Sequence, residues 1–112
     1  MAAPTSTTPL ETPLPSATTL LTAAKLAQQL DRPIQLDYYA DTCIKKAVIG
    51  EDPDSPEKEK ILIKNNDEYT SLIKKVYKAG DDFIVLTENS IYIVSGKVER
   101  RKLNVAALLG SD

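Results

Sequence analysis

The chain contains no histidine and no tryptophan, and it has one cysteine, Cys43, and one phenylalanine among 112 residues. The absence of histidine excludes Ser-His and Cys-His nucleophilic pairs, and also histidine-ligated metal sites. One cysteine cannot form an intramolecular disulfide or a thiolate zinc cage, and it is typical of a reducing compartment. We therefore expect a non-enzymatic protein that has no cofactor, no metal and no small-molecule substrate.

Glycine is also scarce, and the four glycines stand apart from one another at expected turns, so none belongs to a phosphate-binding loop. The acidic residues at 52, 54, 57 and 59 lie close together, but prolines interrupt them and the glycine of an EF-hand loop is missing. We interpret this stretch as a solvated loop. The formal net charge of −2 argues against a protein built mainly to neutralise phosphates.

Charge is nearly absent from residues 1–30, which contain only Glu11 and Lys25, whereas the whole chain has 14 basic and 16 acidic residues. Prolines interrupt residues 1–16, so this segment is expected to be an extended arm rather than a helix or a central strand. An arm with so little charge suits burial against a neighbouring protein. Its candidate partner-binding residues are Pro4, Pro9, Leu10, Pro13, Leu14 and Pro15.

Targeting and membrane signals are not apparent in the sequence. Residues 1–30 lack a basic start and a long apolar run, and the arm has no arginine, so neither a signal peptide nor a transit peptide is expected. No stretch has the roughly 20 mostly apolar residues of a membrane-spanning helix. We expect no membrane span, and a cytoplasmic location if the protein is cellular.

Helical spacing of apolar side chains begins after Ser16, which is a suitable N-cap, and it ends before Pro33. This pattern predicts a helix over residues 17–30, whose apolar stripe consists of Leu20, Ala23, Ala24, Ala27 and Leu30 and is widened by Leu26. A helix of about four turns is marginal alone in water, so it must pack on something. It either caps its own domain or docks on another subunit.

Beyond residue 33, apolar residues alternate or form short runs, and turn residues separate these runs. Strands are expected at 34–39, 47–49, 61–63, 83–86 and 91–94, with a closing strand at 98–103. Residues 71–78 fit a helical turn or a strand, and we favour the strand. Because the connections are short, neighbouring strands should be mostly antiparallel.

The predicted fold is mainly β. We expect a small antiparallel barrel or roll of five to six strands, SH3-like or Sm-like, over residues 33–103, because a closed sheet has no free edges. The single domain would span residues 17–112, after the arm at 1–16. An apolar tail at 104–112 would pack across an open end of the barrel.

The basic residues indicate a second candidate function, the binding of nucleic acid, for which the sequence gives weaker support than for protein binding. Lys45-Lys46, Lys74-Lys75 and a C-terminal run could line up across a curled sheet, and that run, Lys97, Arg100, Arg101 and Lys102, is the candidate basic patch. The five tyrosines offer stacking surfaces for single-stranded nucleic acid, but they are also the main bulky material for the core. Binding of nucleic acid by a small β-barrel therefore stays an alternative to protein binding, and so does a cellular adaptor module.

Several short motifs lie between about residues 31 and 95: Asp37-Tyr38, Ile49-Gly50, Leu62-Ile63-Lys64, Glu68-Tyr69-Thr70-Ser71, Val76-Tyr77-Lys78 and Thr87-Glu88-Asn89-Ser90-Ile91-Tyr92-Ile93-Val94. With these motifs the chain resembles a family of small proteins encoded by large icosahedral DNA viruses, such as the algal viruses and their giant relatives. The resemblance implies a minor capsid protein of the virion that binds beneath or between major capsid subunits, and it implies no catalytic residues. We therefore expect a structural protein whose arm tethers neighbouring capsid subunits.

Overall fold

A computed structural model describes residues 14–55, 58–65 and 67–108. Their strands form two four-stranded sheets: sheet A has the order β1-β7-β6-β5, and sheet B has the order β4-β3-β2-β8. The helices are α1 (Ala17–Leu30), α2 (Tyr39–Cys43) and α3 (Val105–Leu108). The strands are β1 (Ile34–Gln35), β2 (Val48–Glu51), β3 (Lys60–Asn65), β4 (Glu68–Tyr69), β5 (Ile73–Ala79), β6 (Asp82–Thr87), β7 (Ile91–Ser95) and β8 (Glu99–Lys102).

Helix α1 occupies the residues over which the sequence predicts a helix. The Ser16 hydroxyl caps it by accepting a hydrogen bond from the Thr19 backbone N–H at 3.2 Å. Asp31 ends it in the left-handed conformation, with φ 56°, shortly before Pro33. Ala23, in the middle of the helix, is fully buried against sheet A. Helix α1 therefore packs on its own domain.

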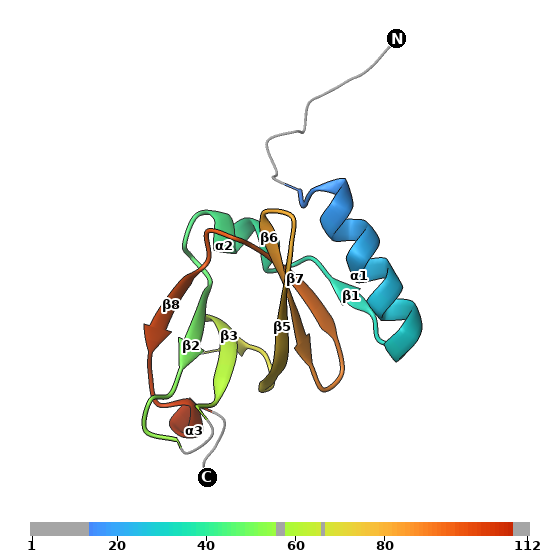
Figure 1. Cartoon of the computed structure of the whole chain (residues 1–112). Coiled ribbons are helices and arrows are strands. Elements are labelled where there is room, and N and C mark those ends of the chain that lie inside the picture. Colours follow the sequence, from blue (N-terminus) through green and yellow to red (C-terminus); the bar gives the residue numbers. More distant parts are fainter. Residues whose placement is uncertain (1–13, 56–57, 66, 109–112) are drawn as a thin grey trace.

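The two sheets are stacked, and side chains at alternate positions of their strands enter different layers. In β6, Ile84 packs in the layer that contains α1, whereas Val85 packs between the sheets. In β3, Leu62 packs between the sheets, whereas Ile61 packs in the layer that contains Val105 of α3. Figure 1 shows α1 on one side of sheet A and sheet B on the other. The resulting layer order is α1, sheet A, sheet B and α3.

The mainly β class and the N-terminal helix agree with the sequence prediction, but no closed barrel is found among residues 14–55, 58–65 and 67–108. Eight strands form two sheets instead of five or six strands in one barrel. Two pairs, β1–β7 and β2–β8, are parallel, so the strand expected to close the barrel instead forms an edge of sheet B. The reason is that β3 and β6 are apolar on both faces, which requires cover on both sides.

The strand expected over residues 34–39 is wrong beyond Gln35, because α2 follows almost at once. Alternation predicts that Tyr38 and Tyr39 point to opposite sides of a strand. In the structure both are buried, Tyr38 between the sheets and Tyr39 in the layer under α1. The Thr42 hydroxyl donates to the Tyr39 carbonyl oxygen at 2.7 Å and supports the helical turn. A short helix thus delivers two adjacent tyrosines to two cores.

Two further predictions, the strand over residues 71–78 and the apolar tail over residues 104–112, differ in their agreement with the structure. Strand β5 confirms the strand interpretation of residues 71–78. The apolar tail does not cover a barrel end: α3 places a fully buried Val105 beside Ile61 on the outer face of sheet B. Residues 109–112 of the tail lie outside the described residues.

We expect Leu62→Ala to lower the free energy of unfolding by about 2 to 5 kcal/mol, because Leu62 is 0% exposed and its loss leaves a cavity between the sheets. The matched control is Leu21→Ala on α1, where the leucine is 60% exposed and the expected loss is below about 0.5 kcal/mol. Urea denaturation followed by circular dichroism measures both values. Equal losses in the two variants would contradict the layered packing.

Candidate functional site

A buried cluster of polar side chains holds the start of α1. Asp82 on β6 is 4% exposed. Its Oδ2 accepts hydrogen bonds from the Thr19 hydroxyl at 2.8 Å and from the Ser16 backbone N–H at 3.4 Å. Its Oδ1 accepts from the Tyr39 hydroxyl of α2 at 2.8 Å. One carboxyl group therefore joins α1, α2 and sheet A.

The buried tyrosines have raised pKa values, which suits a structural role. Burial, followed by the hydrogen bond to Asp82, raises the pKa of Tyr39 well above its ordinary value of 10.0. Burial, with the nearby charge of Asp37, raises the pKa of Tyr38 to about 12. Both hydroxyls therefore stay protonated at neutral pH. We interpret them as packing groups, because a tyrosine that acts as a base needs a lowered pKa.

The predicted partner-binding arm lies mostly outside the described residues, namely at Pro4, Pro9, Leu10 and Pro13. Of the two that are described, Pro15 is buried and Leu14 is 71% exposed. The exposed apolar surface continues onto α1 with Leu20 at 38% and Leu21 at 60%. We call Leu14, Leu20 and Leu21 the α1 apolar patch.

Two residues of this patch were not predicted as partner-binding residues. The sequence predicts Leu20 on the packed stripe of α1, yet the buried side of the helix is centred on Thr19 and Ala23. At 100° per residue, the exposed Ala17 and Ala24 lie between Leu20 and Leu21 on the outer face. A second apolar face opposite the first is the signal that could have identified them.

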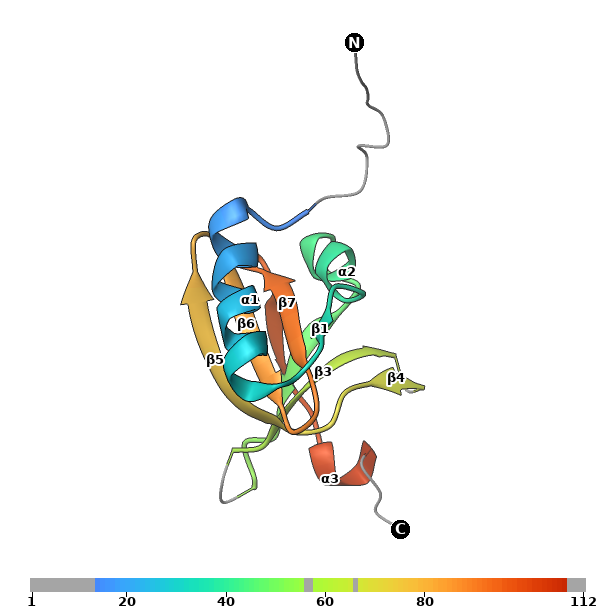
Figure 2. The same cartoon turned by 90° about the vertical axis from the view of Figure 1, so that its right-hand side faces the viewer.

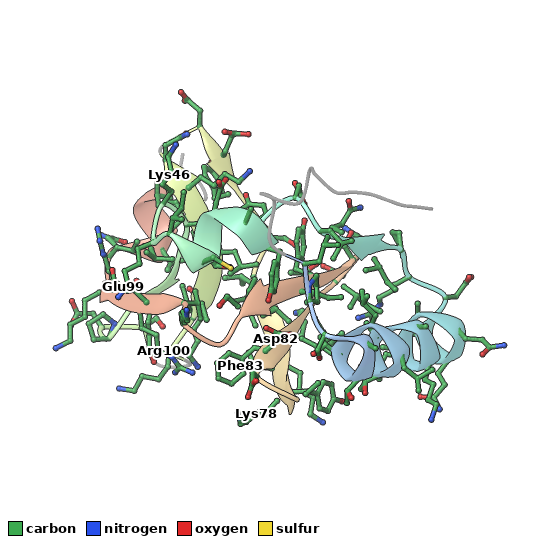
Figure 3. All side chains as sticks on the ribbon, turned by 90° about the horizontal axis from the view of Figure 1, so that it is seen from above. Lys46, Lys78, Asp82, Phe83, Glu99 and Arg100 are labelled. Carbon is green, nitrogen blue, oxygen red and sulfur yellow. The ribbon has the colours of Figure 1, made fainter. Side chains whose placement is uncertain are left out.

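Three of the four residues of the predicted basic patch line different hollows of the structure, and the fourth is ion-paired. Arg100 lines a cleft between the sheets, Lys102 lines a hollow beside Asp52, and Lys97 lines another beside α2. The Arg101 guanidinium pairs with Glu99 at 3.0 Å, and this hydrogen bond lowers the pKa of the Glu99 carboxyl group. In Figure 3, Arg100 lies on the same side of the molecule as Lys78, and Lys46 lies on the opposite side.

The cleft that Arg100 lines lies between the sheets and has a volume of about 370 Å³. We call it the basic cleft. Its basic lining residues are Lys58, Lys60, Lys74, Lys75 and Arg100. Within the described lining, Glu59 is the one acidic residue, and the apolar residues are Ile49, Leu72, Ile73 and Val76. Strand β5 of sheet A forms one wall, and β2, β8 and the start of β3 contribute to the other.

Strand register explains how distant cations reach the basic cleft. Arg100 pairs with Ile49 in the parallel β2–β8 ladder, so both side chains project from the same face of sheet B, toward sheet A. In β5, the pairing with β6 shifts between Ile73 and Lys75, so Lys74 has no partner in that ladder. The sequence suggests that Lys74, Lys75 and Arg100 line up across a curled sheet, but it gives no signal for Lys58 and Lys60, because the lining comes from four segments that only the sheet topology brings together.

Comparison with known proteins found no family model that matches the chain, and no similar curated protein or solved structure. Among the described residues, no group of three or more Cys, Asp or Glu side chains is placed to hold a metal ion. No helix in the same ranges is long and apolar enough to cross a membrane.

We expect Asp82→Ala to lower the free energy of unfolding by about 1 to 3 kcal/mol, because the Tyr39 hydroxyl loses its buried acceptor, whereas the Thr19 hydroxyl can still donate to the Ala79 carbonyl oxygen at 2.9 Å. Asp81→Ala is the matched control, since Asp81 is the exposed neighbour of Asp82. Thermal or urea denaturation measures the difference between the two variants. A loss in Asp82→Ala no larger than in the control would show that the cluster does not anchor α1.

We also expect the protein to lose stability at alkaline pH. In the unfolded chain Tyr38 ionises near pH 10, whereas in the folded protein its pKa is about 12. The folded state therefore holds the proton more tightly, so this contribution is complete below about pH 10 and is lost between about pH 10 and 12. Urea denaturation at a series of pH values measures it, and Tyr38→Phe should reduce the slope. A constant free energy of unfolding between about pH 9 and 12 would contradict the expectation.

Proposed function

We propose that this chain is a non-enzymatic interaction protein that attaches to a neighbouring structural protein through the start of α1 and the arm that precedes it. The observation that carries the proposal is the α1 apolar patch. Three leucines lie exposed where the arm joins the domain, on a helix whose one charged residue is Lys25. Covering such a surface with a partner is favourable, because apolar area is removed from water.

The way in which the arm joins the domain supports a tether. Pro15 is buried, Ser16 caps α1, and the Ser16 backbone N–H and the Thr19 hydroxyl both reach Asp82. A tethering arm can hold two proteins together only if the residues at its junction with the domain are fixed to the fold. Here the junction is held by buried hydrogen bonds to β6 and, through Tyr39, to α2.

A minor capsid protein of a virion is the specific form of this proposal, with other capsid proteins as partners. It rests on the sequence resemblance to small proteins of large icosahedral DNA viruses. The net charge of −2 and the lack of aromatic residues in the described lining of the basic cleft give less support to nucleic acid as the partner. A cellular adaptor would use the same α1 surface on a different partner.

The test measures how much of an epitope-tagged chain co-sediments with virions in a density gradient, using the virus that encodes the chain. We expect Leu14→Asp with Leu21→Asp to reduce the amount in the particle fraction by at least about tenfold, because two charges would be buried against the partner. The matched control is Gln29→Asp with Asn89→Asp, which adds the same charge at exposed positions outside the α1 apolar patch. The control should co-sediment like the unaltered protein, and all melting temperatures should agree.

Equal incorporation of the leucine variant would show that the α1 apolar patch is not the attachment surface. Absence of the unaltered chain from particles would show that the capsid setting is wrong. A variant that lacks residues 1–13 tests the arm separately. The deletion stops there because Pro15 and Ser16 belong to the folded domain.

A further inference from the structure

We propose that the basic cleft binds an acidic, extended segment of a partner protein, which adds as a strand to the free edge of β5. This site goes beyond the attachment proposed for α1. Its lining residues do not include the α1 apolar patch, so each surface can be tested without changing the other.

Strand β5 supplies the backbone groups for such a segment. In the described part of the chain it pairs with β6 alone, because it is the last strand of sheet A. Figure 2 shows β5 at the outer margin of that sheet. An edge strand presents unpaired N–H and C=O groups, and an extended peptide can pair with them. The residues of β5 that line the cleft are those of its first half, from Ile73 to Val76.

The charge of the cleft selects an acidic segment. Among the described lining residues, five cations stand beside one carboxylate, in a chain whose net charge is −2. Within the described residues, Lys60 is the one of these cations with an ion pair, to Glu51 at 3.9 Å. Lys74, Lys75 and Arg100 are exposed on the two walls. Carboxylates held between the walls would gain attraction from both sides.

The apolar lining favours a peptide over nucleic acid. Alternate side chains of an added strand point to opposite sides, so apolar residues can face Ile49 and Val76 while acidic residues face the cations. Single-stranded nucleic acid relies on aromatic platforms, and no aromatic residue is among the described lining residues. Tyr38 and Tyr92 instead pack edge to face in the core, with ring centroids 5.5 Å apart.

The lysines of β5 also explain how the edge avoids the wrong strands. Lysines and bulges on an edge discourage pairing with uncharged strands, and β5 has both near its start. An acidic strand reverses this effect, because each lysine that repels other partners attracts it. The lysines of β5 therefore disfavour uncharged strands and favour acidic ones.

The first experiment measures binding of a fluorescein-labelled heptapeptide of alternating Glu and Val by fluorescence anisotropy at low salt. We expect saturable binding that Lys74→Glu with Arg100→Glu weakens by at least about tenfold, since both walls lose a cation and gain a carboxylate. Lys46→Glu with Lys97→Glu makes the same charge change at exposed residues outside the cleft and should stay within about twofold. Melting temperatures confirm that each variant is folded.

Three further probes separate the parts of the proposal. A Gln/Val peptide of the same length should not bind, and a Glu/Val peptide that is N-methylated at every residue should bind at least about tenfold more weakly, because it has no backbone N–H left to donate to β5. In the unaltered protein, the acidic peptide should slow amide exchange in β5, which needs no variant. Equal binding of either control peptide, unchanged exchange in β5 or tighter binding of oligo-dT at the cleft would overturn the proposal.

Discussion

The β6–β7 hairpin is apolar on both faces, and the described fold is arranged around covering them. Ile84 and Ile93 need cover on one face, which α1 and α2 provide with Ala23 and Tyr39. Val85 and Val94 need it on the other, which sheet B provides with Ile49 and Leu62. Sheet B then has an outer apolar face of its own, and Val105 of α3 covers part of it. Each sheet contributes side chains to two apolar layers, and this is how a small domain buries a large part of its apolar surface.

Two features of the layered fold leave surfaces uncovered: the outer side of α1, and the edges of sheets that stack without closing. Because α1 covers sheet A with one side, its opposite side remains exposed, and the leucines there continue the surface at which the arm begins. Because β5 is an edge strand of one sheet and β8 of the other, the layer between them opens into the basic cleft. The two proposed surfaces use different elements of the fold. The buried Asp82 cluster connects the start of α1 to sheet A.

Much of the local structure could be predicted from sequence. Ser16 and Pro33 bracket the helical spacing of α1, and the runs at 83–86 and 91–94 are strands. The barrel prediction overlooked one signal: strands of a small barrel expose one face, whereas these runs have no polar alternation, which indicates cover on both faces. The helix α2 could not be predicted from alternation, because the buried contacts of Tyr38 and Tyr39 outweigh it. Of the candidate sites, Leu14, Lys74, Lys75 and Arg100 could be named from sequence, whereas the exposure of Leu20 and Leu21 and the place of Lys58 and Lys60 could not.

The sequence by itself determined the helix, most strands, the mainly β class and the lack of histidine chemistry, since these depend on residues that are close along the chain. Only the tertiary structure decided which strands pair in parallel, which leucines remain exposed and which cations share a cleft. Lys58, Lys74 and Arg100 belong to three segments, and their meeting depends on the stacking of two sheets. Pairing between distant strands is set by the burial of both faces together, and no local pattern specifies it.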